Sequence, residues 1–276
     1  MLSKVDEISI IYDKKDAQIL KFGKKYKNAR IVADCTSLTY EELLDNIEIF
    51  KTASNNFEFV VKINYEQKDI LPDLTDNMIK YFFADHVNTV DKLRGFINLG
   101  VSDIYVIDEL AFSLGKIAPM CHDNKVNIRV FPNVAQSSTS IPNDTFKNFF
   151  IRPEDISAYE DYVDYCEFWG PLDRQSVLFK IYKEGQWLGS LNTLILGLER
   201  EIPNTCIVPY FGRARVNCDK RCAYGKCEVC SNIKDLADVL EHRDFGITTE
   251  RKRMDERINI IKEEEDDEDA DFTGSD

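Results

Sequence analysis

The sequence predicts an α/β fold: a TIM-like (β/α) barrel followed by a cysteine-rich segment and a disordered acidic tail. Short runs rich in β-branched and aromatic residues recur through the first two thirds of the 276-residue chain, and such runs are typical of strands. Segments with a helical spacing of apolar residues lie between most of them. This alternation favours a parallel sheet covered by helices, either closed into a barrel or left open as a doubly wound sheet.

The number of predicted strands favours the barrel. Each run is bounded by polar or turn-forming residues, and a barrel of this type has eight parallel strands. The predicted strands are residues 8–12, 30–33, 57–63, 79–84, 103–107, 127–131, 148–151 and 165–169. Residues 132–142, which begin and end with proline, are expected to form a loop.

The clearest helical patterns are residues 39–50, 90–99 and 110–120. Thr39 and Glu42 form a capping-box pattern at the start of the first helix. Gly100 is well placed to end the second, because glycine readily adopts the left-handed conformation that often follows a helix. Pro119 limits the third, because proline lacks a backbone N–H.

The pattern changes after Gly170. Residues 177–188 suggest a hairpin or an extended segment around a turn-like Lys-Glu-Gly-Gln sequence. Residues 191–198 predict a short apolar helix, and residues 232–243 predict an amphipathic helix that covers one end of the domain.

Composition divides the chain into three parts. Residues 1–200 are expected to form the barrel, residues 201–245 a metal- or cluster-binding segment with its covering helix, and residues 246–276 a charged, largely disordered tail. The formal charge of −14 is concentrated in residues 263–276, which hold nine acidic and no basic side chains. Such a tail is expected to stay solvated, with contact to a protein partner as its alternative role.

We expect a cytoplasmic protein without a membrane anchor. The first residues lack the basic region and apolar stretch of a secretory signal, and no run reaches the ~20 apolar residues of a membrane span. In a reducing compartment, eight cysteines are better explained by metal-binding thiolates than by disulfides.

Half of the cysteines stand within residues 217–230, called the cysteine run below. They are Cys218, Cys222, Cys227 and Cys230. Four thiolates on a tight loop can converge on one tetrahedral site, and Gly225 permits the turn. Zinc sites prefer paired C-x2-C elements, and iron–sulfur clusters also use C-x2-C and C-x3-C spacings. The spacing therefore leaves both a 4Fe-4S cluster and zinc open, with Cys206 and Cys35 as substitute ligands.

Polar residues follow most of the predicted strands, at the end where a barrel enzyme has its active site. The predicted rim includes Asp34, Asn64, Asp85 and Asp108. The catalytic candidates are His86, Glu109 and Arg152. His86 or Glu109 would transfer protons, and Arg152 would bind an anionic group. For each rim residue, a helix-capping or loop role is the alternative.

One stretch, residues 81–131, resembles a known family. It contains Leu-Gly at 99–100, Glu-Leu-Ala-Phe-Ser-Leu at 109–114 and Ile-Arg-Val-Phe at 128–131. These elements resemble a turn, a Glu-Leu-Ser-Leu-like element and a strand of the collagenase-like proteins of peptidase family U32. Family members follow that strand with a glycine-containing motif that bears a cysteine, whereas residues 132–142 hold no cysteine.

The resemblance implies a TIM-like barrel that carries a cysteine-ligated 4Fe-4S cluster. Members of the family look like oxygen-independent hydroxylases that act on ubiquinone precursors or RNA bases, some with prephenate as the oxygen donor. In one branch a distant N-terminal cysteine joins three later ones. The residues that approximate this arrangement are Cys35, Cys206, Cys218 and Cys222.

These observations lead to one favoured function and two alternatives. The favoured function is a U32-like iron–sulfur enzyme that hydroxylates or otherwise modifies a small aromatic or RNA-base substrate. One alternative is a non-catalytic barrel scaffold with a zinc-stapled module of four cysteines that binds a protein partner. The other is a peptidase, as the family name implies, although the sequence shows no nucleophilic triad or zinc-protease helix motif.

Overall fold

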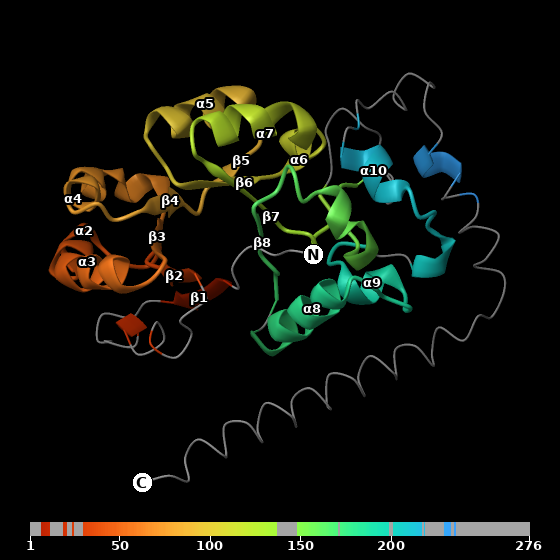
Figure 1. Cartoon of the computed structure of the whole chain (residues 1–276), viewed down its shortest axis with the longest axis horizontal. Helices are drawn as coiled ribbons and strands as arrows, with labels where there is room; N and C mark the ends of the chain where they lie inside the picture. Colours follow the sequence, from red (N-terminus) through yellow and green to blue (C-terminus); the bar gives the residue numbers. More distant parts are fainter. Residues whose placement is uncertain are drawn as a thin grey trace, which may run out of the picture. The chain divides into compact units, whose positions relative to one another are not determined.

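The computed structural model of the chain describes residues 7–11, 19–20, 24, 30–136, 148–170, 172–198, 201–216, 218, 229–232 and 235. This part is a mixed α/β structure with parallel strands (Figure 1). It divides into two compact units. The N-terminal unit comprises Ser3–Leu110 and Ile117–Arg129, and the C-terminal unit comprises Met1–Leu2, Ala111–Lys116 and Val130–Asp276.

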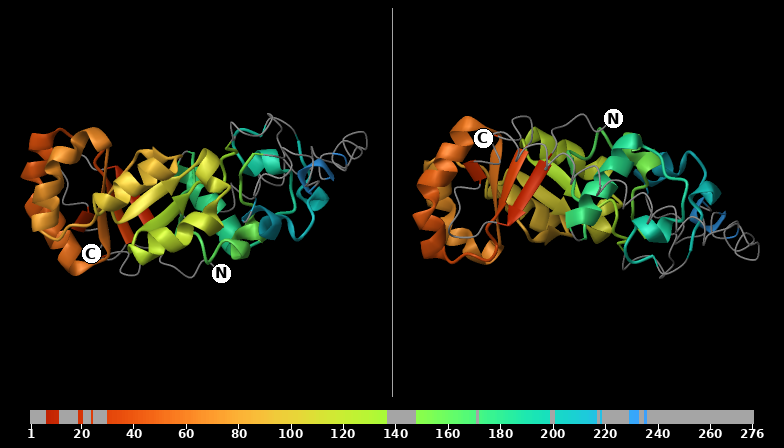
Figure 2. Two further views of the ribbon diagram at one scale, coloured as in Figure 1. Left: turned by 90° about the horizontal axis from the view of Figure 1, so that it is seen from above. Right: turned by 90° about the horizontal axis from the view of Figure 1, so that it is seen from below.

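The strands of the N-terminal unit form two parallel series, in which β1 to β4 and then β5 to β7 pair in chain order. Their bounds are β1 Glu7–Ile11, β2 Arg30–Asp34, β3 Phe59–Ile63, β4 Tyr81–Phe83, β5 His86–Val87, β6 Asp103–Val106 and β7 Asn127–Val130. Figure 2 shows the neighbouring strands β1 and β2, at the red end of the colour scale, side by side.

Ser102 joins the two series. Its backbone N–H donates to the Tyr81 carbonyl at 2.9 Å, and its carbonyl accepts from the Asn127 N–H at 2.9 Å.

The sequence patterns predicted the strands of the N-terminal unit, except β5, with small shifts at their ends. They did not predict β5, which follows β4 closely and is only two residues long.

Helices follow most of the strands in this unit. Their bounds are α2 Tyr40–Asp45, α3 Ile47–Asn56, the 3-10 helix η1 Tyr65–Ile70, α4 Leu71–Asp76, α5 Val90–Asn98, α6 Asp108–Ala111 and α7 Leu114–Asp123. Parts of α6 and α7 belong to the C-terminal unit.

The predicted capping box is confirmed, because the Glu42 N–H donates to Thr39 Oγ1 at 3.3 Å and the Thr39 N–H donates to Glu42 Oε2 at 2.8 Å. Gly100 follows α5 with φ 74°, as expected for a residue that ends a helix.

Two predicted helices are each divided. Asn46 separates α2 from α3 within residues 39–50, and its side-chain amide donates back to the Glu42 carbonyl at 2.6 Å. The single helix expected over residues 110–120 is instead α6 and α7, and Pro119 lies inside α7.

The parallel strands carry charged side chains on one face. Asp34 of β2 is opposite Lys62 of β3, and Arg30 shares the face of Asp34 because side chains alternate along a strand. Ile31 and Ala33 point to the other face and are fully buried. Since both faces of a parallel sheet are normally covered, charges on one of them must be paired or reach water.

Four charged side chains form what we call the base cluster, and three of them belong to the first residue of their strand. Its members are Glu7 of β1, Arg30 of β2, Asp103 of β6 and Arg129 of β7. Arg30 donates to both Asp103 oxygens at 2.6 and 2.7 Å. Arg129 donates to Asp103 Oδ1 at 3.2 Å and to Glu7 Oε1 at 2.7 Å. Two carboxylates therefore balance two guanidinium groups.

The C-terminal unit contains one long helix and several short elements. Their bounds are the 3-10 helix η3 Pro153–Ala158, β8 Tyr165–Cys166, α8 Leu172–Glu184, α9 Leu191–Leu194, the 3-10 helix η4 Asn204–Cys206 and α10 Phe211–Val216. The strand predicted at residues 165–169 is confirmed in part by β8. The strand predicted at residues 148–151 is wrong: Phe149 forms only an isolated antiparallel bridge with Gln136.

The extended segment or hairpin predicted for residues 177–188 is also wrong. Most of it belongs to α8, whose buried residues are Val177, Leu178, Ile181 and Tyr182. These positions recur with helical spacing. The segment is therefore helical, although its β-branched residues favour a strand. Gly185 follows the helix with φ 70° and donates its N–H to the Ile181 carbonyl at 3.1 Å.

Some predictions fall wholly or largely outside the described residues, namely the amphipathic helix at 232–243 and the acidic tail. Among the residues that are described, no helix has the length and apolar character needed to cross a membrane.

Candidate functional site

Four side chains meet near the C-terminal ends of the strands in the N-terminal unit. We call them the strand-end cluster: Asp34 of β2, Lys62 of β3, His86 of β5 and Tyr105 of β6. In parallel α/β folds, ligands bind at this end of the strands, because loops rather than neighbouring strands surround the side chains there.

Asp34 is held in place and in turn positions Lys62. The Thr36 N–H and hydroxyl donate to Asp34 Oδ1 at 3.2 and 2.7 Å. The other carboxylate oxygen lies 3.2 Å from Lys62 Nζ, and the Lys62 side chain is 14% exposed. The ammonium group is therefore fixed at a site that solvent still reaches.

Tyr105 is the centre of the cluster. Its ring is buried, and the Lys62 ammonium lies 5.6 Å from the ring centroid. His86 and Phe82 contact the ring edge-to-face at 5.8 and 5.5 Å. From the base cluster, the Arg129 guanidinium lies 4.5 Å from the Phe82 centroid and 5.6 Å from that of Tyr105. The Phe82 and Tyr105 rings thus connect Arg129 of the base cluster with the other side chains of the strand-end cluster.

His86 is half-buried, and its environment favours the neutral imidazole. Burial lowers the pKa of His86, and the charges of Lys92 and Lys62 lower it further, while Asp108 and Asp85 act in the opposite direction. A neutral imidazole can both donate and accept a proton near pH 7, which is the property that a general acid–base residue needs. Asp108 follows β6 with φ 50°, a strained backbone conformation that is common beside functional sites.

The three predicted catalytic residues have different surroundings. His86 belongs to the strand-end cluster. Glu109 lies in α6, next to Asp108, and its side chain is outside the described part of the structure. Arg152 lies in the C-terminal unit, where its Nε and Nη2 donate to the Asp155 carboxylate at 2.6 and 2.9 Å and its Nη1 donates to Asn204 Oδ1 at 3.0 Å. These contacts give Arg152 a structural function, and anion binding by Arg152 stays a prediction.

Two cysteines of the run are described, and both contact Arg215 of α10. The Cys218 N–H donates to the Arg215 carbonyl at 3.0 Å, and the Arg215 Nη1 donates to Cys230 Sγ at 3.4 Å. Cys222 and Cys227 lie outside the described residues, as does the side chain of Cys206. Among the residues described, no group of three or more His, Cys, Asp or Glu side chains is placed to hold a metal.

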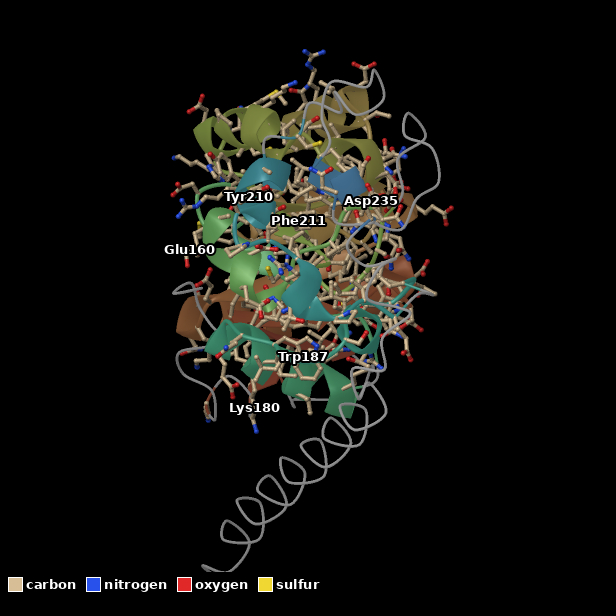
Figure 3. The ribbon with its side chains drawn as sticks, turned by 90° about the vertical axis from the view of Figure 1, so that its right-hand side faces the viewer. Glu160, Lys180, Trp187, Tyr210, Phe211 and Asp235 are labelled. Atoms are coloured by element: carbon tan, nitrogen blue, oxygen red, sulfur yellow. The ribbon has the colours of Figure 1, made fainter. Side chains whose placement is uncertain are left out.

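Arg215 is buried inside an aromatic cage. Its guanidinium lies 5.1, 5.9 and 5.2 Å from the ring centroids of Phe112, Phe150 and Phe211, and it also donates to the Asn148 carbonyl. Figure 3 labels Phe211, which lies on α10. A buried guanidinium beside a sulfur atom stabilises the thiolate, which is the form that binds metals.

Cys35 lies in the N-terminal unit and is fully buried. Burial raises the pKa of the Cys35 thiol, and the neighbouring carboxylate of Asp34 raises it further. A thiol in such a place is a poor metal ligand, because binding requires deprotonation.

The sequence patterns did not identify Lys62 and Tyr105 as site residues. The available signal was a lysine in the apolar strand Phe-Val-Val-Lys-Ile, since a charged residue within a buried strand needs a partner or a function.

Comparisons of the chain with family models, with curated proteins and with solved structures find no match. The resemblance to peptidase family U32 therefore stays a prediction.

Proposed function

We propose that this protein is an iron–sulfur enzyme on a TIM-like barrel, which carries out an oxygen-independent hydroxylation or related modification of a small aromatic or RNA-base substrate. The observation that supports it best is the contact of the buried Arg215 guanidinium with Cys230 Sγ, while the backbone N–H of Cys218 donates to the Arg215 carbonyl. Positive charge and N–H donors stabilise thiolate ligands and the negative charge of a cluster.

The barrel is supported by contacts within the N-terminal unit. Arg129 of β7 donates to Glu7 of β1, although these are the last and first strands of the N-terminal unit along the chain and belong to different sheets. In a flat open sheet their side chains would be separated by the strands between them, whereas in a curved sheet the inward-facing side chains meet.

Two of the proposed ligands, Cys218 and Cys230, lie in the described part of the chain. Cys218 and Cys230 both contact Arg215, so the two ends of the cysteine run lie near one another. We propose Cys218, Cys222, Cys227 and Cys230 as the ligands. Cys206 remains a substitute, and the buried Cys35 is the least suitable one. When bound, such a cluster would supply single electrons or a Lewis-acidic iron.

The substrate would react at the strand-end cluster. His86, as a neutral imidazole, would take up or release the proton that the modification requires. Lys62, held by Asp34, would stabilise negative charge that develops on a substrate oxygen. A cysteine peptidase is less favoured, because Cys35, the thiol that directly follows Asp34, is buried and its pKa is raised.

A zinc-stapled scaffold is the second candidate. It is favoured by the burial of Cys35, which leaves the four cysteines of the run as a complete local set, the composition of a structural zinc site. In this case the module would bind a protein partner, and the strand-end cluster would have no catalytic function.

Metal and acid-labile sulfide analysis of protein purified without oxygen distinguishes the iron–sulfur enzyme from the zinc-stapled scaffold. An iron–sulfur enzyme should contain about four iron and four sulfide per chain and absorb near 400 nm. Cys218→Ala should lose the cluster, whereas Cys121→Ala, at a buried position in α7, should retain it. One zinc without sulfide would support the scaffold and contradict the enzyme.

A further inference from the structure

Trp169 is a large aromatic side chain that the fold leaves in contact with solvent. It is 54% exposed, whereas Trp187, the other tryptophan of the chain, is 6% exposed. A single exposed apolar residue is common and needs no explanation by itself. Trp169 differs in two respects: buried residues hold its backbone and its ring, and an arginine that forms no ion pair within the described part of the chain lies beside it.

Two buried residues that follow β7 hold Trp169 in place. The Trp169 N–H donates to Asn133 Oδ1 at 2.9 Å, and Asn133 Nδ2 donates to the Trp169 carbonyl at 2.8 Å. Asn133 is completely buried, so water does not compete for these hydrogen bonds. The buried Phe131 ring contacts the indole with 5.6 Å between the ring centroids and 76° between the ring planes. The indole is therefore positioned before a ligand arrives, which lowers the entropic cost of binding.

Trp169 also lies at the end of the strands where ligands of parallel α/β folds bind. The Glu167 N–H donates to the Val130 carbonyl at 3.0 Å, which pairs the last residue of β7 with the residue after β8. Phe131 directly follows β7 and Trp169 closely follows β8, and their rings are in contact. The C-terminal ends of these two strands therefore meet at the indole, and ligand sites of such folds are found at these ends.

Arg174 of α8 brings a positive charge next to Trp169. Its side chain lies against Gly170, the residue after Trp169, because a Cβ on Gly170 would be 3.3 Å from Arg174 Cδ. Gly170 has φ 141°, a conformation that favours glycine, and the missing side chain leaves room for the arginine.

The Arg174 guanidinium has more hydrogen-bonding capacity than the described residues use. Its Nη2 donates to the Thr193 carbonyl at 2.6 Å, and its Nε is buried without a hydrogen-bond partner among the described residues. No carboxylate of the described residues forms an ion pair with it. A guanidinium with an unused N–H and no counter-ion favours an anionic oxygen as its next partner.

We propose that Trp169 and Arg174 form a binding site for a small aromatic anion, a planar ring that carries a carboxylate or a phosphate. The ring would stack on the exposed surface of the indole, and the anionic oxygens would accept hydrogen bonds from the guanidinium. The site lies in the C-terminal unit. It requires no metal in the cysteine run, so it goes beyond the proposed function and does not depend on it.

Isothermal titration calorimetry of the full-length protein tests the site with benzoate and with adenosine monophosphate, which represent the carboxylate and the phosphate. Cyclohexanecarboxylate and ribose 5-phosphate are the matched probes without an aromatic ring, and benzyl alcohol and adenosine are the matched probes without the charge. We expect at least one aromatic anion to bind, and its matched probes to bind about 10-fold more weakly. The tighter of the two aromatic anions identifies the acidic group. No binding of either anion, or equal binding of an anion and its matched probes, would overturn the inference.

Substitutions assign the binding to these two residues. Trp169→Leu and Arg174→Gln should each weaken binding of the aromatic anion about 10-fold. Trp169→Leu should also weaken binding of the uncharged aromatic probe, whereas Arg174→Gln should leave that binding unchanged. Arg174→Lys should lie between Arg174→Gln and the wild type, because lysine keeps the charge but not the planar donor geometry.

The control is Tyr210→Leu, which removes a side chain that is 56% exposed in the same unit and is labelled in Figure 3. This change should leave binding unchanged. Trp169→Leu should keep the wild-type melting temperature, because more than half of the side chain is exposed, so its weaker binding would reflect a lost contact rather than lost folding. Wild-type affinity in both Trp169→Leu and Arg174→Gln would overturn the inference, whatever metal the cysteine run contains.

Discussion

Arg30 of β2 donates two hydrogen bonds to Asp103 of β6, at 2.6 and 2.7 Å, although the two strands belong to different sheets. Both side chains are completely buried. A buried ion pair adds little net stability, but removing one partner leaves an uncompensated charge in the interior. The base cluster therefore determines which substitutions this unit can tolerate.

Asp103→Asn should destabilise the protein by about 3–5 kcal/mol, because Arg30 and Arg129 would lose their shared carboxylate. Urea denaturation would measure the free energy of unfolding. The control is Asp91→Asn, whose carboxylate is 96% exposed and lies 3.6 Å from Arg94. That change should have almost no effect, and an equal effect of both substitutions would contradict the importance of burial.

Acid should destabilise the protein through the same residue. Burial by itself would raise the pKa of Asp103, but the hydrogen bond from Arg30 and the charge of Arg129 lower it below the ordinary value of 3.8. The resulting stabilisation is complete above that value and is lost as the pH falls through the lowered pKa of the folded state. Urea midpoints measured from pH 6 to pH 2.5 should therefore fall steeply at the acid end in the wild type, and less so in Asp103→Asn.

His86 should titrate below the ordinary value of 6.5, because burial and the nearby cations Lys92 and Lys62 disfavour its charged form. NMR titration can follow it, since the chain has three histidines. Lys62→Met should raise the pKa of His86 by removing a cation. No change in Lys62→Met would mean that the two groups do not interact, and the proposed reaction site would lose support.

The low pKa of His86 also has a consequence for stability. The folded state binds fewer protons than the unfolded state between the two pKa values, so the stability contributed by neutral His86 is present above pH 6.5 and decreases below it. In His86→Gln, the free energy of unfolding should depend less on pH between 7.5 and 5 than in the wild type. An unchanged slope would contradict the lowered pKa.

Two glycine substitutions should have opposite effects. At Gly212 in α10, a Cβ would lie 2.5 Å from the Cβ of Asp155, the residue whose carboxylate accepts from Arg152. Gly212→Ala should therefore cost about 1–3 kcal/mol. At Gly95 in α5, a Cβ would meet nothing within 4 Å, so Gly95→Ala should stabilise the protein by about 1 kcal/mol. Thermal unfolding of both variants would check the prediction.

Local chemistry explains which parts of the fold the sequence could predict. Thr39 and Glu42 cap a helix, and Gly100 ends another, because these effects depend only on residues within one turn. The strands of the N-terminal unit follow from short apolar runs. The helix α8 was missed, because a run such as Val-Leu-Phe-Lys-Ile-Tyr has both strand-like composition and helical spacing, and burial against the rest of the unit decides between them.

The sequence by itself determined the alternation of strands and helices, the polar strand ends and the concentration of thiols in the cysteine run. Only the tertiary structure decided which charges meet. Arg30 and Asp103 are 73 positions apart and Glu7 and Arg129 are 122 apart, and no local pattern encodes such pairs. Lys62 joins Asp34, Tyr105 and His86 for the same reason: strand register, set by burial of the apolar face, brings side chains from separate strands to one place.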